Sequence, residues 1–314
     1  MLTVSSSPHV RGKQTTRSIM TDVLIALLPA CAVGIYVFKL RALLLMVVGV
    51  ATCMITEFCC EKIMHRDVTV GDMSAAVTGL LLALNVPVNC PWWVLMIGCI
   101  FAIVAVKQIF GGLGCNFANP ALAARVLLVA SWPSHMTGKA FIPVWDTVTT
   151  ATPLALIKEG GAASEIPSAL SMFLGTGGVY GCIGEISAAA LIIGFIYLLY
   201  RKVISWRIPV TYVCTVAVLS FCFGLSAYEV LIQVLAGGLM LGAIFMATDY
   251  VTSPATPNAQ FIYAFGCGLM TVLIRQKGGY PEGVSFSILF MNFVTPLLDK
   301  YMRIKKYGEV KKNA

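Results

Sequence analysis

One hydroxyl-rich segment of the chain is suited to covalent modification. It reads Asp146-Thr147-Val148-Thr149-Thr150-Ala151-Thr152-Pro153. The ring of Pro153 biases Thr152 towards an extended backbone, which makes its hydroxyl accessible to a modifying enzyme. This reasoning is generic, so the residues alone do not name the modification.

A second group of candidates consists of acidic residues in or beside apolar segments. Ionisable groups within a bilayer indicate either an ion path or polar packing. Glu185 is expected early in its helix, where an acid suits the positive end of the helix dipole. The others are expected near segment ends, within reach of headgroups or as helix caps, and none is assigned a transport role: Asp22, Glu57, Asp249 and Asp299.

Other catalytic or metal-binding patterns are not found. The three histidines (His9, His65 and His135) fall in tails or loops and form no cluster. The eleven cysteines are scattered without a Cys-x-x-Cys spacing, so we expect neither a zinc site nor an iron–sulfur cluster. Buried cysteine acting as a small hydrophobe is the preferred interpretation.

The composition defines the elements that must position these groups. Of 314 residues, 58% are hydrophobic and only 11% are charged, whereas a soluble domain carries about 25% charged residues. This excludes a soluble enzyme and a disordered chain. Long apolar runs, without the alternating strands of a lipid-facing barrel, predict an all-α polytopic membrane protein.

About ten membrane segments are expected. The third and fifth are too short to cross a core that needs ~20 residues, so they are expected to be broken or re-entrant. The segments are Ile19–Phe38, Ala42–Cys60, Met73–Val86, Trp92–Phe110, Asn119–Ser131, Gly181–Tyr200, Ile208–Leu225, Val230–Thr248, Phe261–Ile274 and Val284–Tyr301.

The distribution of Lys and Arg predicts the orientation. With both termini in the cytoplasm, fifteen basic residues, Lys107 among them, lie inside and six, including Arg275, lie outside. This bias accounts for most of the net charge of +8 without nucleic acid. The expected organisation is a cytoplasmic tail (1–18), a first five-helix repeat (19–131), an extracytoplasmic stretch (132–180), a second repeat (181–302) and a second cytoplasmic tail (303–314).

An internal repeat supports two halves of five helices. At a spacing of 168 residues, Ile97-Gly98-Cys99 and Val106-Lys107-Gln108 recur as Phe265-Gly266-Cys267 and Ile274-Arg275-Gln276. Because five is odd, the halves must be inverted in the membrane, an arrangement that usually encloses a site near the midplane. Helix interruptions are expected at Asn85-Val86-Pro87, Gly111–Asn116, Asn119-Pro120 and Thr252–Pro257.

Over its whole length the sequence resembles the D subunit of the Rnf complex, and more distantly the B subunit of Na⁺-translocating NADH:quinone oxidoreductase. The segments that carry the resemblance are Ser7-Pro8-His9, Ser74–Leu84, Lys107–Asn116, Phe117–Ala121, Met246–Pro254 and Tyr280–Val284.

The resemblance implies that Thr152 carries FMN through a phosphoester bond added by a flavin transferase. Asp146, Thr149 and Ala151 align with the family's attachment motif, whereas Thr150 stands where the family usually has glycine. It also implies a non-covalent riboflavin nearer the cytoplasmic side, to which no residues can be assigned.

As a function, the resemblance implies a redox subunit of a bacterial cytoplasmic-membrane complex that couples electron transfer between ferredoxin and NAD⁺ to export of Na⁺ or H⁺. The ferredoxin and NAD sites would lie on other membrane or peripheral subunits. The alternative is a channel or transporter for a small polar solute, because the family's fold looks like that of urea channels. The sequence does not choose between Na⁺ and H⁺.

Overall fold

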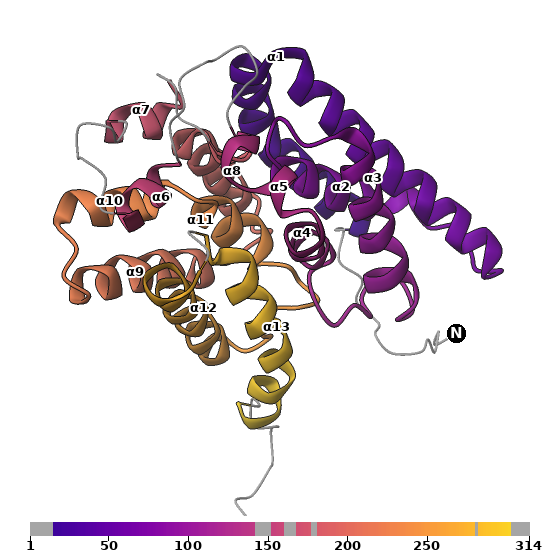
Figure 1. Ribbon diagram of the computed structural model, residues 1–314. Helices are drawn as coiled ribbons and strands as arrows, with labels where there is room; N and C mark the ends of the chain where they lie inside the picture. Colours follow the sequence, from indigo (N-terminus) through magenta and orange to yellow (C-terminus); the bar gives the residue numbers. More distant parts are fainter. Residues whose placement is uncertain (1–14, 142–151, 160–167, 177–180, 280–281, 303–314) are drawn as a thin grey trace, which may run out of the picture.

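The computed structural model describes residues 15–141, 152–159, 168–176, 181–279 and 282–302. These residues are helical apart from their connections, and the one β interaction among them is an isolated bridge between Pro87 and Cys182. The prediction of an all-α protein is therefore confirmed (Figure 1).

The elements follow the predicted apolar segments. Short or irregular helical turns are labelled η, of which η2 and η5 have π-helical geometry. In chain order the elements are α1 (Thr16–Ile63), η1 (Val70–Asp72), α2 (Ser74–Leu84), α3 (Trp92–Phe101), η2 (Ala102–Gln108), α4 (Pro120–Ser131), α5 (Pro133–Met136), η3 (Gly138–Phe141), α6 (Pro153–Glu159), α7 (Ala169–Leu174), α8 (Ala188–Tyr200), α9 (Arg207–Cys222), α10 (Ala227–Leu235), α11 (Leu239–Leu241), η5 (Gly242–Met246), α12 (Pro257–Lys277) and α13 (Val284–Tyr301).

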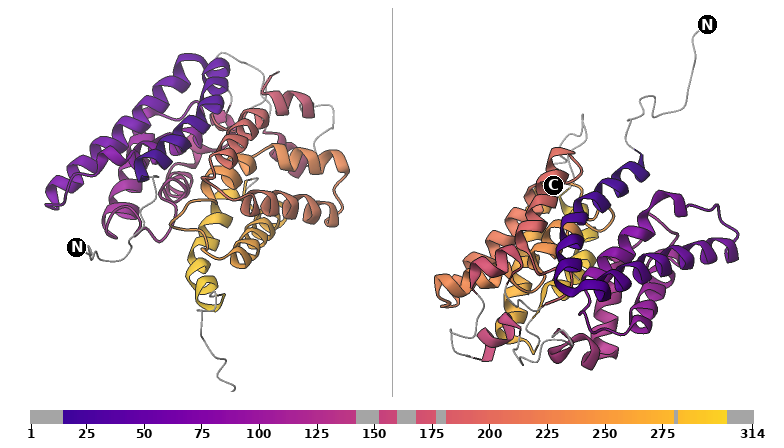
Figure 2. Two further views of the ribbon diagram at one scale, coloured as in Figure 1. Left: turned by 180° about the vertical axis from the view of Figure 1, so that it is seen from behind. Right: turned by 90° about the horizontal axis from the view of Figure 1, so that it is seen from above.

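Helix α1 consists of two limbs. Its 48 residues would extend about 70 Å if straight, more than twice the ~30 Å hydrocarbon core. Lys39 interrupts it with a φ of 56° and a ψ of −143°. The limbs, 16–38 and 40–63, diverge from this point (Figure 2) and match the first two predicted segments.

By length and composition, two of the described helices, α1 and α12, are long and apolar enough to cross a membrane. A third span is counted if α10 and the continuous α11–η5, bent by 57° at their break, form one crossing. Helices α2 and α4 have 11 and 12 residues, so the third and fifth segments are short, as predicted. The inverted relation of the two halves stays a prediction.

The two halves of the chain form two neighbouring groups of helices. Figure 1 shows α1–α5 on one side and α9–α13 on the other, with α6 beside α10. They meet where α1 packs on α8 and where α4 packs on α13. One continuous apolar core runs through both groups and includes Leu27, Leu82 and Leu122 from the first half and Leu191 and Ile244 from the second.

The predicted interruptions are confirmed where helices begin and end. Helix α2 ends at Leu84, directly before Asn85. Asn119 caps α4 by accepting from the Ala121 and Leu122 amides at 3.0 and 3.3 Å. Thr256 caps α12 in the same way, and each cap is followed by a proline that needs no hydrogen-bond acceptor.

A glycine contact sets the distance between α1 and α2. A Cβ added at Gly79 would lie less than 2.5 Å from the Gly49 carbonyl oxygen, and one added at Gly49 would lie 2.8 Å from the Gly79 carbonyl oxygen. Small residues allow such close backbone approach between membrane helices. The second limb of α1 can therefore pack on α2 only if both positions lack a side chain.

We predict that Gly79→Ala lowers the free energy of unfolding by about 1–3 kcal/mol, because the added methyl group forces the two backbones apart. Gly71→Ala is the matched control, since a Cβ there meets nothing within 4 Å. The measurement is the thermal unfolding midpoint of the purified protein in detergent. Equal midpoints for the two variants would contradict the predicted close packing.

Candidate functional site

Thr152 lies at the start of α6, next to Pro153. Its side-chain oxygen accepts a hydrogen bond from the Ala155 amide at 3.4 Å, and its carbonyl accepts from the Leu156 amide at 3.0 Å. The residue is partly exposed. Among the described residues, its hydroxyl makes one long hydrogen bond, while Asp146, Thr149, Thr150 and Ala151 lie outside those residues.

Thr152 lines a small pocket. Its closed part has a volume of about 20 Å³, enough for one water molecule. Apolar side chains from α6, α7 and α10 line one part of it, and two carboxylates line the other. The residues are Thr152, Pro153, Leu154, Met172, Gly181, Glu185, Ile186, Leu235, Ala236, Gly237 and Glu282.

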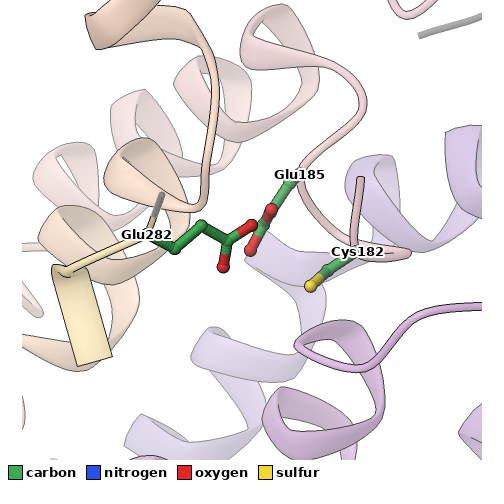
Figure 3. A group of neighbouring side chains, drawn as sticks. All are labelled: Cys182, Glu185 and Glu282. Carbon is green, nitrogen blue, oxygen red and sulfur yellow. The ribbon is translucent and has the colours of Figure 1, made fainter. Parts of the chain in front are cut away.

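The two carboxylates belong to a buried charged cluster around Arg125 of α4. Glu185 lies in the turn before α8 and Glu282 lies just before α13, and Figure 3 shows their side chains pointing towards each other beside Cys182. The Arg125 terminal nitrogens donate to Asn85 Oδ1 (2.8 Å), Ser285 Oγ (3.2 Å), Cys182 Sγ (3.4 Å) and Glu282 Oε2, and Nη1 lies 3.5 Å from Glu185 Oε1.

The expected position of Glu185 in a helix is wrong. Helix α8 begins at Ala188 and is capped by Ser187, whose hydroxyl accepts from the Ala190 amide at 3.3 Å. The turn before α8 is instead bound to the end of α2, because the Leu84 carbonyl accepts a hydrogen bond from the Gly184 amide at 2.8 Å. This backbone contact overrides helix formation and places Glu185 in the interior.

The broken helix α10–α11 contacts the same cluster. Gly237 and Gly238 have φ values of 70° and 67°, which glycine adopts readily. A Cβ at Gly238 would lie 2.5 Å from Glu185 Oε1, so this glycine also makes room for the carboxylate. Arg275 of α12 donates to the carbonyls of Gln233, Ala236 and Gly237, which the break leaves without helical partners.

A second buried ion pair joins α1 to η2. Lys107 Nζ lies 2.5 Å from Glu57 Oε1 and 2.5 Å from Ser74 Oγ, and Gln108 Nε2 donates to Glu57 Oε1 at 3.1 Å. Glu57 is 0% exposed and Lys107 is 2% exposed. Glu57 is therefore buried instead of reaching the headgroups, and Lys107, which is counted as a cytoplasmic charge at the end of the fourth segment, is also buried.

A larger cavity lies between the two halves of the chain. Including its mouth, it measures about 840 Å³. Val77, Leu81 and Phe245 are among its apolar walls, and its polar groups come from Ser74, Thr78, Lys107, Asn116, Asn119, Thr248 and Asp249. Asn119 also donates to the Met246 carbonyl at 3.2 Å, which ties the halves together at this cavity.

The remaining acids lie at ends of helices, as predicted. Asp22 pairs with Arg201 at 3.2 Å and accepts from the Tyr197 hydroxyl at 2.9 Å. Asp299 accepts from the Ala255 amide at 3.1 Å. Asp249 accepts from the Thr252 hydroxyl at 3.0 Å and lines the large cavity.

Sequence reasoning misses the partners of three buried cations: Lys107, Arg125 and Arg275. Arg125 lies within the predicted segment Asn119–Ser131, which marks it as a membrane-embedded cation, but the sequence does not predict its partners. Lys107 and Arg275 are counted as a cytoplasmic and an extracytoplasmic charge, respectively, when the sequence alone is considered. Leaving both residues out of the count therefore keeps the excess of basic residues on the cytoplasmic side.

We predict that Lys107→Met destabilises the protein by about 3–5 kcal/mol, because it leaves the Glu57 carboxylate buried without a cation. The double variant Glu57→Gln/Lys107→Met should recover most of that loss. Unfolding in mixed micelles measures the free energies, with Lys277→Met at an exposed position as the control. A double variant as unstable as Lys107→Met would contradict a paired charge.

Comparison with known proteins gives matches along the whole chain. The family described as "NQR2, RnfD, RnfE family" matches residues 3–308. The D subunit of the Na(+)-translocating ferredoxin:NAD(+) oxidoreductase complex of Acetobacterium woodii is 56% identical over 315 residues, covering 100% of this chain and 98% of the relative.

Two further relatives are less similar but also match nearly the whole chain. The D subunit of the proton-translocating ferredoxin:NAD(+) oxidoreductase complex of Clostridium ljungdahlii is 43% identical, with 98% of this chain and 96% of the relative covered. The D subunit of the ion-translocating oxidoreductase complex of Halorhodospira halophila is 36% identical over the same shares. The chain belongs to the NQR2, RnfD, RnfE family.

Proposed function

We propose that this protein is the flavin-carrying membrane subunit of a complex that couples electron transfer between ferredoxin and NAD⁺ to translocation of Na⁺ or H⁺. The full-length family match and relatives named as the D subunits of such complexes support this function. They also favour it over a solute channel, which rested on the fold alone. The ferredoxin and NAD sites belong to other subunits of the complex.

Thr152 is the proposed attachment residue for FMN. The observation that carries this assignment is its partly exposed hydroxyl, which makes one long hydrogen bond and so remains available for a phosphoester. A flavin transferase would form the Oγ1–P bond to the riboflavin phosphate of a flavin dinucleotide. The phosphoanhydride P–O bond would break, the nucleoside monophosphate would leave, and the Oγ1 proton would pass to a base of the transferase. Asp146, Thr149 and Ala151 complete the motif that the enzyme recognises.

The pocket beside Thr152 limits where the flavin ring can lie. Its closed volume of about 20 Å³ holds one water molecule, so it cannot hold the three-ring system. The ring therefore lies outside this pocket, against the surface of this subunit or of a partner. When bound, FMN supplies one- and two-electron chemistry, while the protein positions it.

The large cavity between the halves is the proposed site of the non-covalent riboflavin. Its closed part measures about 100 Å³, against about 20 Å³ for the pocket beside Thr152, and a flavin ring would extend from it into the open mouth that brings the total space to about 840 Å³. Val77, Leu81 and Phe245 offer apolar contact for the ring, and Asn116 offers an amide for its polar edge. The residues present thus fit this group.

The first limb of α1 separates the two proposed flavin sites. Ile19 and Met20 line the large cavity, whereas Gly34 contacts Ile183 in the turn that carries Glu185. Fifteen residues of helix correspond to about 22 Å. This separation supports the proposed extracytoplasmic position of Thr152, with the riboflavin nearer the cytoplasmic termini of an inverted-repeat protein in the bacterial cytoplasmic membrane.

We predict that the protein band fluoresces under ultraviolet light on a denaturing gel after coexpression with a flavin transferase. Thr152→Ala should be dark because it removes the oxygen that forms the phosphoester. Thr152→Ser, which keeps the hydroxyl, is the matched control and should fluoresce. A dark wild-type band, or a fluorescent Thr152→Ala band, would refute the attachment.

We also predict that Asn116→Leu lowers the content of releasable riboflavin at least tenfold while leaving the gel fluorescence intact. The change keeps the size of the side chain and removes its amide. The measurement is chromatography of the flavin released when the purified complex is denatured. Asn258→Leu, at an exposed position of α12, is the control. Wild-type riboflavin content in Asn116→Leu would count against this cavity.

A further inference from the structure

The cluster around Arg125 contains an acid without a hydrogen-bond partner. Each terminal nitrogen of a guanidinium has two hydrogens, and Arg125 directs them to Asn85, Ser285, Cys182 and Glu282. None remains for Glu185. Both of its carboxylate oxygens are buried and have no hydrogen-bond partner among the residues that the structure describes.

Two cations lie near this cluster, yet neither donates a hydrogen bond to Glu185. Arg125 lies beside both acids, and the Arg275 guanidinium donates to the α10 carbonyls. Glu185 is only 7% exposed, and burying a carboxylate that accepts no hydrogen bond is strongly unfavourable. A proton or a small cation at its oxygens would relieve this cost.

The structure provides room for that charge beside both acids. The pocket of about 20 Å³ is lined by Glu185 and Glu282, and it is large enough for one water-sized occupant. In Figure 3 the two carboxylates face each other across this region. Carboxylate oxygens are the ligands of hard cations, and either carboxylate can also take up a proton.

Cys182 does not make this a site for a transition metal. Its sulfur and one oxygen from each carboxylate lie within 4.8 Å of one another. However, the sulfur accepts a hydrogen bond from Arg125 at 3.4 Å. A divalent ion bound to that sulfur would lie within a few ångströms of a guanidinium and be repelled. A single positive charge is repelled less by the guanidinium and is the better match to this site.

We propose that Glu185 and Glu282 bind one monovalent positive charge, a proton or a sodium ion, in the pocket beside Thr152. The binding site follows from the geometry and charge of the cluster, and its place on the ion path rests on the proposed function. Two of the relatives described above are named for Na⁺ and for protons, respectively, so the experiment must separate these two cations.

The test is infrared difference spectroscopy of the purified complex, titrated with pH or with NaCl at constant ionic strength. A carboxylic-acid band that disappears as the pH rises, independently of Na⁺, identifies a proton. A carboxylate band that shifts with NaCl at constant pH identifies a sodium ion. Glu185→Gln should abolish the response in either case, and identical responses in wild type and Glu185→Gln would overturn the proposal.

Three variants make the outcome specific. Asp22→Asn removes an acid that is paired with Arg201 and should retain the response. Thr152→Ala should retain it although its gel band is dark, which separates this site from the flavin assignment. If Glu185→Gln does not assemble, Glu282→Gln replaces it and should lose the same response.

The role in transport is tested with the complex in proteoliposomes. Glu185→Gln should reduce cation uptake per electron pair at least tenfold relative to wild type and Asp22→Asn. Undiminished uptake would overturn the place of the site on the ion path.

Discussion

The interior of a membrane protein offers no water to charged groups, so each buried charge must find its partner within the chain. The architecture depends on this constraint. Lys107 forms an ion pair with Glu57 and thereby joins η2 to the second limb of α1. Arg125 donates hydrogen bonds to Asn85, Ser285 and Glu282 and thereby joins α4 to elements from both halves. Each pair adds little net stability compared with apolar packing, but losing one partner leaves a charge that the interior cannot accommodate. The pairs therefore specify which helices meet.

The same constraint explains how the broken helices are tolerated. Where α10 stops at Leu235, the carbonyls of its last turn lack helical donors, and the Arg275 guanidinium supplies them from α12. At the end of α2, the Leu84 carbonyl accepts a hydrogen bond from the Gly184 amide, and just beyond it the Val86 carbonyl accepts one from the Ile183 amide. In both places an interruption from one part of the chain is completed by a distant part. The interruption after α2 is thus built into the contact between the halves, whereas that after α10 is completed within the second half, and both lie beside the Arg125 cluster.

Local sequence patterns predict the helices but not the charge pairs. Hydropathy locates the apolar segments, and Asn119-Pro120 and Thr256-Pro257 mark helix starts because capping and proline effects act within a few residues. Glu57 and Lys107 are fifty residues apart, and no periodicity connects them. Glu185 is expected in a helix because the apolar run begins at Gly181, whereas a backbone contact from the α2 break holds that turn. Thr152 is identified only through a family resemblance, since a threonine-rich turn is common and its chemistry depends on an external enzyme.

The position of Thr152 beside the Glu185–Glu282 pair gives a physical reason for coupling electrons to cations. One extra negative charge about 10 Å from the pair, at an effective dielectric constant of about 20, would stabilise a bound cation by about 1.7 kcal/mol, which is nearly a twentyfold change in affinity. Moving that cation against 100 mV requires about 2.3 kcal/mol. Because the first quantity is smaller than the second, charge attraction alone cannot drive translocation. The energy of cation binding must also favour one of two conformations of the protein. The break at Gly237 and Gly238, where Glu185 contacts the bent helix pair, is the element whose conformation cation binding can change.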